Sequence, residues 1–115
     1  MAKGATQPSA IYDYTSKKGY NAIRATQEWC FKAARPPAPE HEVGAYFTTY
    51  APNEPNLSIK IRVPREKLEF VFSFVDVGDL LPLRGWRGQG IFFSSTDYHV
   101  ARSRQIFHGP REAQP

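Results

Sequence analysis

The chain has 115 residues, a length that predicts one domain with a core of its own. Hydrophobic residues make up 41% of it and charged residues 23%, which excludes a disordered chain. The net charge of +4 is compatible with phosphate-bearing ligands, but the basic residues are scattered along the sequence and form no block.

Cysteine usage and hydropathy limit the setting in which the chain works. Cys30 is the single cysteine, so an intramolecular disulfide and a cysteine-based zinc site are excluded and a reducing environment is indicated. The first nine residues contain no apolar segment of a signal peptide, and no stretch approaches the roughly 20 apolar residues of a membrane helix. We therefore expect a soluble chain without a membrane partner, acting in the cytoplasm or delivered there as an effector.

The first half of the chain predicts two strands around one helix. Residues 1–9 are expected to be a flexible terminus, and the domain to begin at residue 10. "AIYDYT" is typical of a strand, and Thr15 or Ser16 is suited to cap a helix that runs to about Thr26. "EWCFKA" again has strand composition, and Cys30 is expected to be a small buried side chain in it. "ARPPAPEHEVG" is a loop because its prolines suit neither a helix interior nor a central strand.

Strands dominate the second half. "GAYFTTY" is followed by the turn "APNEPN", and "LSIKIRV" and "LEFVFSFVDV" both alternate at the period of a strand. "GIFF" and "RQIF" predict short later strands, while "TDYHV" suits a surface turn. The domain is expected to end at about residue 109, with 110–115 as a flexible terminus. The sum is an α+β domain of about six strands with one early helix.

Sequence motifs of common enzymes are missing. The chain has no GxSxG, HExxH, P-loop or strand-linked GxGxxG motif. Its three histidines, His41, His99 and His108, are too far apart in sequence for ligand spacing, so we predict no metal site. Composition and spacing alone lead no further than a soluble basic α+β domain.

Two motifs carry a family resemblance. "YDYTSKKGYNAI" resembles the first motif of the ADP-ribosyltransferase superfamily in its His–Tyr–Glu branch, which contains the PARP- and diphtheria-toxin-like proteins, and is most similar to compact toxin domains of the HYD1 kind. "GAYFTT" is similar to the second motif, Gly-x-Tyr-Phe followed by hydroxyl residues. "GQGIFF" offers Gln89 where the family places an acid or amide before a late strand. The resemblance covers about residues 10 to 108.

The resemblance implies a compact split β-sandwich that holds NAD and transfers ADP-ribose to a macromolecular acceptor with release of nicotinamide. No metal is needed, and a toxin of this kind would have a neutralising partner. The implied NAD-binding residues are Asp13, Tyr14, Thr15, Tyr46 and Thr48, with Tyr46 stacking on nicotinamide. Gln89, together with Tyr46, is the implied catalytic residue, since it would orient the nicotinamide ribose beside an oxocarbenium-like centre. Arg24, Arg35 and Arg84 are candidates for the pyrophosphate.

Two positions depart from the family pattern. Asp13 stands where the family has histidine, and a carboxylate can accept two ribose hydroxyl hydrogen bonds, although its charge disfavours a nearby pyrophosphate. Gln89 stands where many members have glutamate, and it cannot act as a general base. The third acid is alternatively Asp76, Asp79 or Asp97.

Other interpretations remain open at this point. An NAD glycohydrolase would use water as the acceptor, and a small domain offers little surface for a protein target. A non-catalytic module would be either a degenerate NAD-binding domain or a nucleic-acid-binding sheet that uses exposed tyrosines for stacking. In the plainest interpretation, Tyr12, Tyr14 and Tyr46 are ordinary strand aromatics, Asp13 caps the helix and Gln89 lies in a turn.

Overall fold

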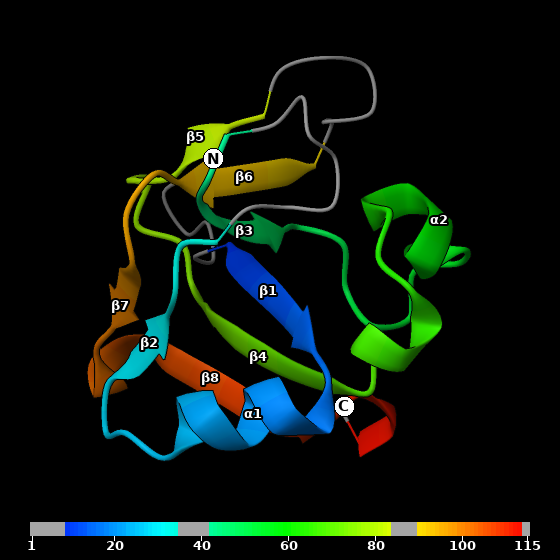
Figure 1. Cartoon of the computed structure of the whole chain (residues 1–115), viewed down its shortest axis with the longest axis horizontal. Coiled ribbons are helices and arrows are strands. Elements are labelled where there is room, and N and C mark those ends of the chain that lie inside the picture. Colours follow the sequence, from blue (N-terminus) through cyan, green and yellow to red (C-terminus); the bar gives the residue numbers. More distant parts are fainter. Residues whose placement is uncertain (1–8, 35–41, 84–89, 114–115) are drawn as a thin grey trace, which may run out of the picture.

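A six-stranded antiparallel sheet forms the centre of the molecule (Figure 1). The computed structural model describes residues 9–34, 42–83 and 90–113. The strands lie in the order β5-β6-β3-β1-β4-β8. Their bounds are Ala10–Thr15 (β1), Ala45–Thr48 (β3), Phe70–Val75 (β4), Leu81–Pro82 (β5), Ile91–Ser94 (β6) and Gln105–Pro110 (β8).

The sheet divides between β1 and β3. Strand β1 pairs with β4 over its whole length, from Ala10 opposite Val75 to Thr15 opposite Phe70. Its register with β3 consists of one pair, Tyr12 opposite Thr48, and Figure 1 shows the two strands diverging from there. The strands β5-β6-β3 and β1-β4-β8 are therefore two halves of one sheet that share a single registered residue pair.

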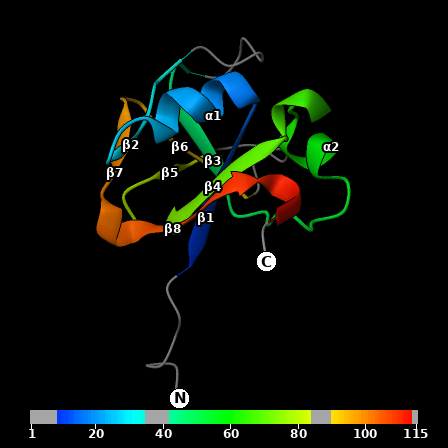
Figure 2. The same ribbon diagram turned by 90° about the horizontal axis from the view of Figure 1, so that it is seen from below.

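One face of the sheet is covered by α1 (Lys17–Arg24) and by a two-stranded sheet of β2 (Trp29–Phe31) and β7 (Tyr98–Val100). Figure 2 shows α1 on one side of β4 and β8. The Tyr20 ring stacks on Phe70 with centroids 4.4 Å apart, and Trp29 meets the buried Phe72 edge to face at 4.8 Å. Interlocked aromatic rings thus hold this cover in place.

Smaller helical turns pack elsewhere on the sheet. They are α2 (Leu57–Ile61), η2 (Arg65–Lys67), η4 (Arg102–Arg104) and η5 (Arg111–Ala113). Val71 alternates with Phe70 and Phe72, so it points to the face opposite α1, and it is fully buried. Leu57 and Leu68 are also buried but lie outside the main aromatic cluster. Arg111, in a segment expected to be a flexible terminus, donates hydrogen bonds to the carbonyl oxygens of Leu68 and Pro52.

Most predicted elements are confirmed. The strands expected in "AIYDYT", "EWCFKA", "GAYFTTY", "LEFVFSFVDV", "GIFF" and "RQIF" correspond to β1, β2, β3, β4, β6 and β8. The early helix is α1, and Ser16 is its N-cap, with the side-chain oxygen accepting a long 3.4 Å hydrogen bond from the Gly19 amide. The expected α+β class is confirmed as a compact globule with a six-stranded sheet, a two-stranded sheet and one main helix.

Several predictions about local structure were wrong. "LSIKIRV" is not a strand: Asn56 and Arg62 both adopt a left-handed backbone with φ of 59° and enclose the short helix α2. "TDYHV" is not a surface turn, because its last three residues form β7, with Tyr98 and Val100 buried against the core. Cys30 is only half-buried, since it points away from the side of β2 that buries Trp29 and Phe31.

No helix among residues 9–34, 42–83 and 90–113 is long and apolar enough to cross a membrane.

Candidate functional site

A small hollow lies where β1 and β3 separate. Four of the residues predicted to bind NAD line it: Asp13, Tyr14, Tyr46 and Thr48. Its volume is about 70 Å³, smaller than the 300–1,000 Å³ of typical small-molecule sites and enough for part of a ring. The separation of the strands explains the hollow, because β3 no longer covers the edge of β1 after Tyr12.

Asp13 is the least satisfied polar side chain of this site. It lies in the middle of β1, opposite Phe72 of the neighbouring strand β4. It does not cap α1, because the N-cap of that helix is Ser16. Among the described residues no side chain or backbone amide donates a hydrogen bond to its carboxyl group. Burial raises the pKa of the Asp13 carboxyl from 3.8 to about 8. An unpaired carboxyl in a strand interior destabilises a fold, and such groups are concentrated at functional sites.

Tyr14 and Thr15 follow Asp13 along the free edge of β1. The Tyr14 hydroxyl donates a 2.8 Å hydrogen bond to the carbonyl oxygen of Tyr50, and burial, as the largest cause, raises its pKa. The Tyr12 and Tyr14 rings lie nearly parallel, with centroids 6.4 Å apart. Thr15 packs beside Gly19, whose missing Cβ would lie 2.1 Å from the Thr15 Oγ1 atom. The motif from Tyr12 to Gly19 thus fixes the junction between β1 and α1.

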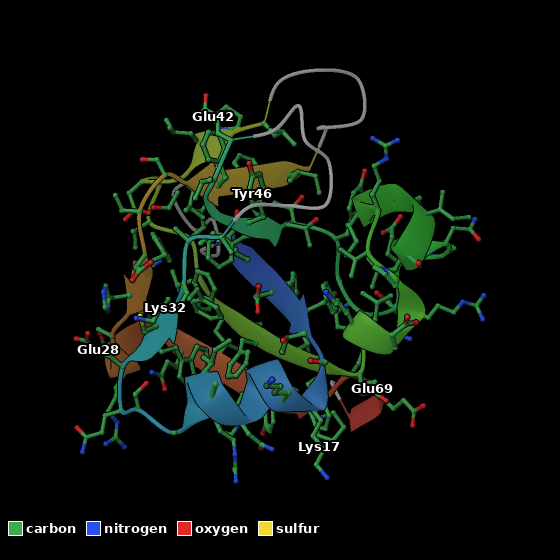
Figure 3. The ribbon with its side chains drawn as sticks, viewed as in Figure 1. Lys17, Glu28, Lys32, Glu42, Tyr46 and Glu69 are labelled. Carbon is green, nitrogen blue, oxygen red and sulfur yellow. The ribbon has the colours of Figure 1, made fainter. Side chains whose placement is uncertain are left out.

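Tyr46 has a fixed orientation on β3 (Figure 3). Its ring stacks on Phe93 of β6 with centroids 5.5 Å apart and planes 19° apart. Its hydroxyl donates to the carbonyl oxygen of Glu42, just before the strand, and burial raises its pKa. A part-exposed aromatic ring held at both its face and its hydroxyl is pre-organised for stacking.

Thr48 supports the hollow from within. It is 3% exposed, and its hydroxyl donates to the carbonyl oxygen of Gly90 at 2.8 Å. The Thr48 Oγ1 atom in turn accepts from the Tyr50 amide at 3.0 Å. These bonds tie the end of β3 to the residue before β6. The Thr48 hydroxyl has therefore already donated its one proton.

The predicted residues meet from two faces of the sheet. Side chains alternate along a strand, so Asp13 and Thr15 point to the α1 face, where Phe72 lies, and Tyr14 points to the opposite face. Tyr46 and Thr48 share the face of Tyr12 because Thr48 is opposite Tyr12. Among the described residues, side chains from both faces of the sheet line the same hollow at the open edge of β1.

Other predicted residues lie apart from the hollow. Gln89, Arg35 and Arg84 fall outside the described residues. Arg24 lies with its guanidinium carbon 5.5 Å from the Tyr20 ring centroid, on the α1 side. The three alternative acids accept structural hydrogen bonds, and none of them lines the hollow within the described part of the chain: Asp76 accepts from the Gly78 amide, Asp79 from the Tyr98 hydroxyl and Asp97 from the Ala33 amide.

Besides Phe47, which belongs to the second motif, three apolar residues of the hollow lie outside both motifs. Ile61 and Val63 come from α2 and the turn after it, and Ile91 comes from β6. The period-two pattern of "LSIKIRV" concealed the first two, because it suggested a strand where the chain forms a helix. Ile91 lies in a strand that was predicted, but no residue pattern indicated its neighbours.

A metal centre is not formed by the described residues, among which no three His, Cys, Asp or Glu side chains gather. Comparisons of the chain with models of known protein families, with curated proteins and with solved structures found no match in any of the three.

Proposed function

We propose that the chain is an ADP-ribosyltransferase that cleaves NAD, releases nicotinamide and passes ADP-ribose to a macromolecular acceptor. The observation that carries this proposal is the separation of β1 and β3 after the Tyr12–Thr48 pair. This separation leaves a hollow that is lined by residues from both of the motifs that resemble the superfamily. The two half-sheets are compatible with the finer prediction of a split β-sandwich.

The open edge of β1 suits an extended dinucleotide. Backbone groups at Tyr14 that β3 does not cover are available for the nicotinamide carboxamide, and the Tyr46 ring is oriented for stacking on the cationic nicotinamide. NAD bound in this way would pass between the half-sheets, with its adenosine ribose toward Asp13. Gln89 remains the predicted residue for the nicotinamide ribose.

The raised pKa of Asp13 helps to reconcile its position with NAD binding. With a pKa of about 8, the carboxyl group is mostly neutral at pH 7. A neutral carboxyl both donates and accepts a hydrogen bond, which suits a ribose diol, and it does not repel a pyrophosphate. In this proposal, Asp13 replaces the family histidine as a neutral hydrogen-bonding group.

The test is incubation of the full chain with NAD, with free nicotinamide measured with and without protein or RNA acceptors. We expect release that depends on an acceptor. The Tyr46→Ala variant should lose about 1–3 kcal/mol of NAD binding, a fall of about 5- to 150-fold in affinity, because the stacking surface is removed. Tyr46→Phe keeps the ring and is the matched control, expected to bind NAD within about twofold of the parent.

Each other result identifies an alternative. Nicotinamide release without an acceptor would indicate a glycohydrolase. If the incubation releases no nicotinamide and calorimetry detects no NAD binding, both enzyme functions would be rejected and a non-catalytic module would remain. Unchanged NAD affinity in a folded Tyr46→Ala protein would reject the site at the hollow, whatever the activity.

A further inference from the structure

A second cavity lies at the end of the β4–β8 ladder, where Phe70 is opposite Pro110. Its volume is about 290 Å³, close to the lower limit of small-molecule sites. Leu68, Phe70 and Pro110 contribute its apolar lining, and Leu68 is 2% exposed. An apolar surface in a cavity of this size is suited to a ligand with a few carbon atoms to bury.

Four charged residues complete the lining, two of each sign. Arg65 comes from η2, Glu69 from the bend just before β4, and Arg111 and Glu112 from η5. Arg111 is fixed, because its Nε donates to the carbonyl oxygen of Leu68 at 2.9 Å and its Nη1 donates to that of Pro52 at 3.2 Å. Within the described residues no ion pair joins Arg65, Glu69 or Glu112 to any partner. The cavity therefore presents both charges without neutralising them internally.

We propose that this cavity binds a small zwitterion of the α-amino-acid type with an apolar side chain. The arginines face the carboxylate, the glutamates face the ammonium group, and the ligand's side chain lies over Phe70 and Pro110, above the buried Leu68. A ligand with one charge is attracted by two residues and repelled by the other two, so it gains little. A ligand with both charges gains from both pairs when oriented correctly. The inference does not rest on NAD chemistry.

L-Leucine is the probe, titrated into the full chain and followed by backbone amide chemical shifts in NMR. We expect saturable binding in the millimolar range, with shifts centred on residues 65–70, 111 and 112. The controls are 4-methylpentanoate, which lacks the ammonium group, and 3-methylbutylamine, which lacks the carboxylate. Each should bind at least about tenfold more weakly, since each loses one charge-assisted contact. Equal binding of the three compounds would overturn the proposal.

Variants on one turn separate a local effect from overall charge. Glu69→Gln and Arg65→Gln remove charges that line the cavity and should each weaken leucine binding at least about fivefold. Glu66→Gln and Lys67→Gln remove the same charges from exposed neighbours that do not line it, and they should leave binding unchanged. The site would be refuted if the folded parent did not bind leucine at concentrations 50-fold above the expected dissociation constant. An equal loss of leucine affinity in all four variants would also refute it.

Discussion

Asp13→Asn is expected to stabilise the protein at neutral and alkaline pH. Burial raises the pKa of the Asp13 carboxyl from 3.8 to about 8 in the folded state. Between pH 4 and 8 the folded chain therefore keeps a proton on Asp13 that the unfolded chain releases. The contribution of Asp13 to the free energy of unfolding is fully present below about pH 4, decreases as pH rises toward 8, and is constant above that. Asparagine has almost the same shape and does not ionise, so the variant escapes this loss.

The size of the effect follows from the pKa. Each pKa unit corresponds to about 1.4 kcal/mol, which sets an upper limit of about 6 kcal/mol above pH 8. Most of the Asp13 side chain is covered, so we expect most of this penalty, about 4–6 kcal/mol. Urea unfolding of parent and variant at pH 4, 6, 7.5 and 9 measures it. The difference should be near zero at pH 4 and should increase with pH.

Asp97→Asn is the matched control with the opposite sign. The Ala33 amide donates a 2.8 Å hydrogen bond to the Asp97 carboxylate, with Lys32 nearby, and this bond as the largest cause lowers the pKa of Asp97. Its contribution to stability is present at neutral pH and is lost as pH falls. Asp97→Asn should therefore destabilise the chain above pH 4, whereas a pH-independent difference for Asp13→Asn would contradict the environment described for Asp13.

A stabilising Asp13→Asn variant would bear on function as well. A carboxyl group that meets no hydrogen-bond donor among the described residues, and that lowers stability, is retained for a reason other than folding. If Asp13 holds the adenosine ribose as proposed, the same variant should bind NAD within about tenfold of the parent at pH 6, where both side chains are neutral and both donate and accept. At pH 9, where the parent carboxyl is charged and repels the pyrophosphate, the variant should bind NAD more tightly than the parent. Greater stability together with unaltered NAD affinity at pH 9 would place Asp13 outside the ribose site.

The local parts of the fold could be predicted from the sequence, and the partners of each strand could not. Alternation of Phe70, Phe72 and Phe74 identified β4, and the choice of Thr15 or Ser16 as helix cap marked the start of α1. The same alternation in residues 57–63 was misleading, because the left-handed backbone at Asn56 and Arg62 ends each side of a short helix there. Asn56 closes the predicted turn "APNEPN", and asparagine tolerates the left-handed region, but Arg62 carries no such sequence signal.

Part of the lining of the hollow was named by the two motifs, and its geometry was not. The two motifs named Asp13, Tyr14, Tyr46 and Thr48, and all four border the hollow. The sequence carried no information on the single pair between β1 and β3, which creates the hollow and sets Asp13 and Tyr46 on different faces. Strand divergence depends on how two half-sheets pack on their own cores, and this is a long-range property.

Gly19→Ala is expected to destabilise the protein by about 2 kcal/mol, against the usual gain from replacing glycine in a helix. Alanine at an ordinary helical site is more favourable than glycine by about 0.5–1 kcal/mol. Here the added Cβ would lie 2.1 Å from the Thr15 Oγ1 atom, so Thr15 must leave its rotamer or α1 must move off the end of β1. Asn21→Ala, at an exposed position of the same helix, is the control and should stabilise slightly.

The double variant Thr15→Ala/Gly19→Ala decides whether this contact is the cause. Removing the Thr15 hydroxyl leaves space for the new Cβ, so the double variant should be more stable than Gly19→Ala alone. A double-mutant cycle from thermal or urea unfolding should give a coupling of about 1–3 kcal/mol, in the range for residues in contact. Additive effects would mean that α1 does not begin against Thr15 as described. A strong coupling would explain, from packing alone, why a hydroxyl residue after the strand is followed four positions later by glycine.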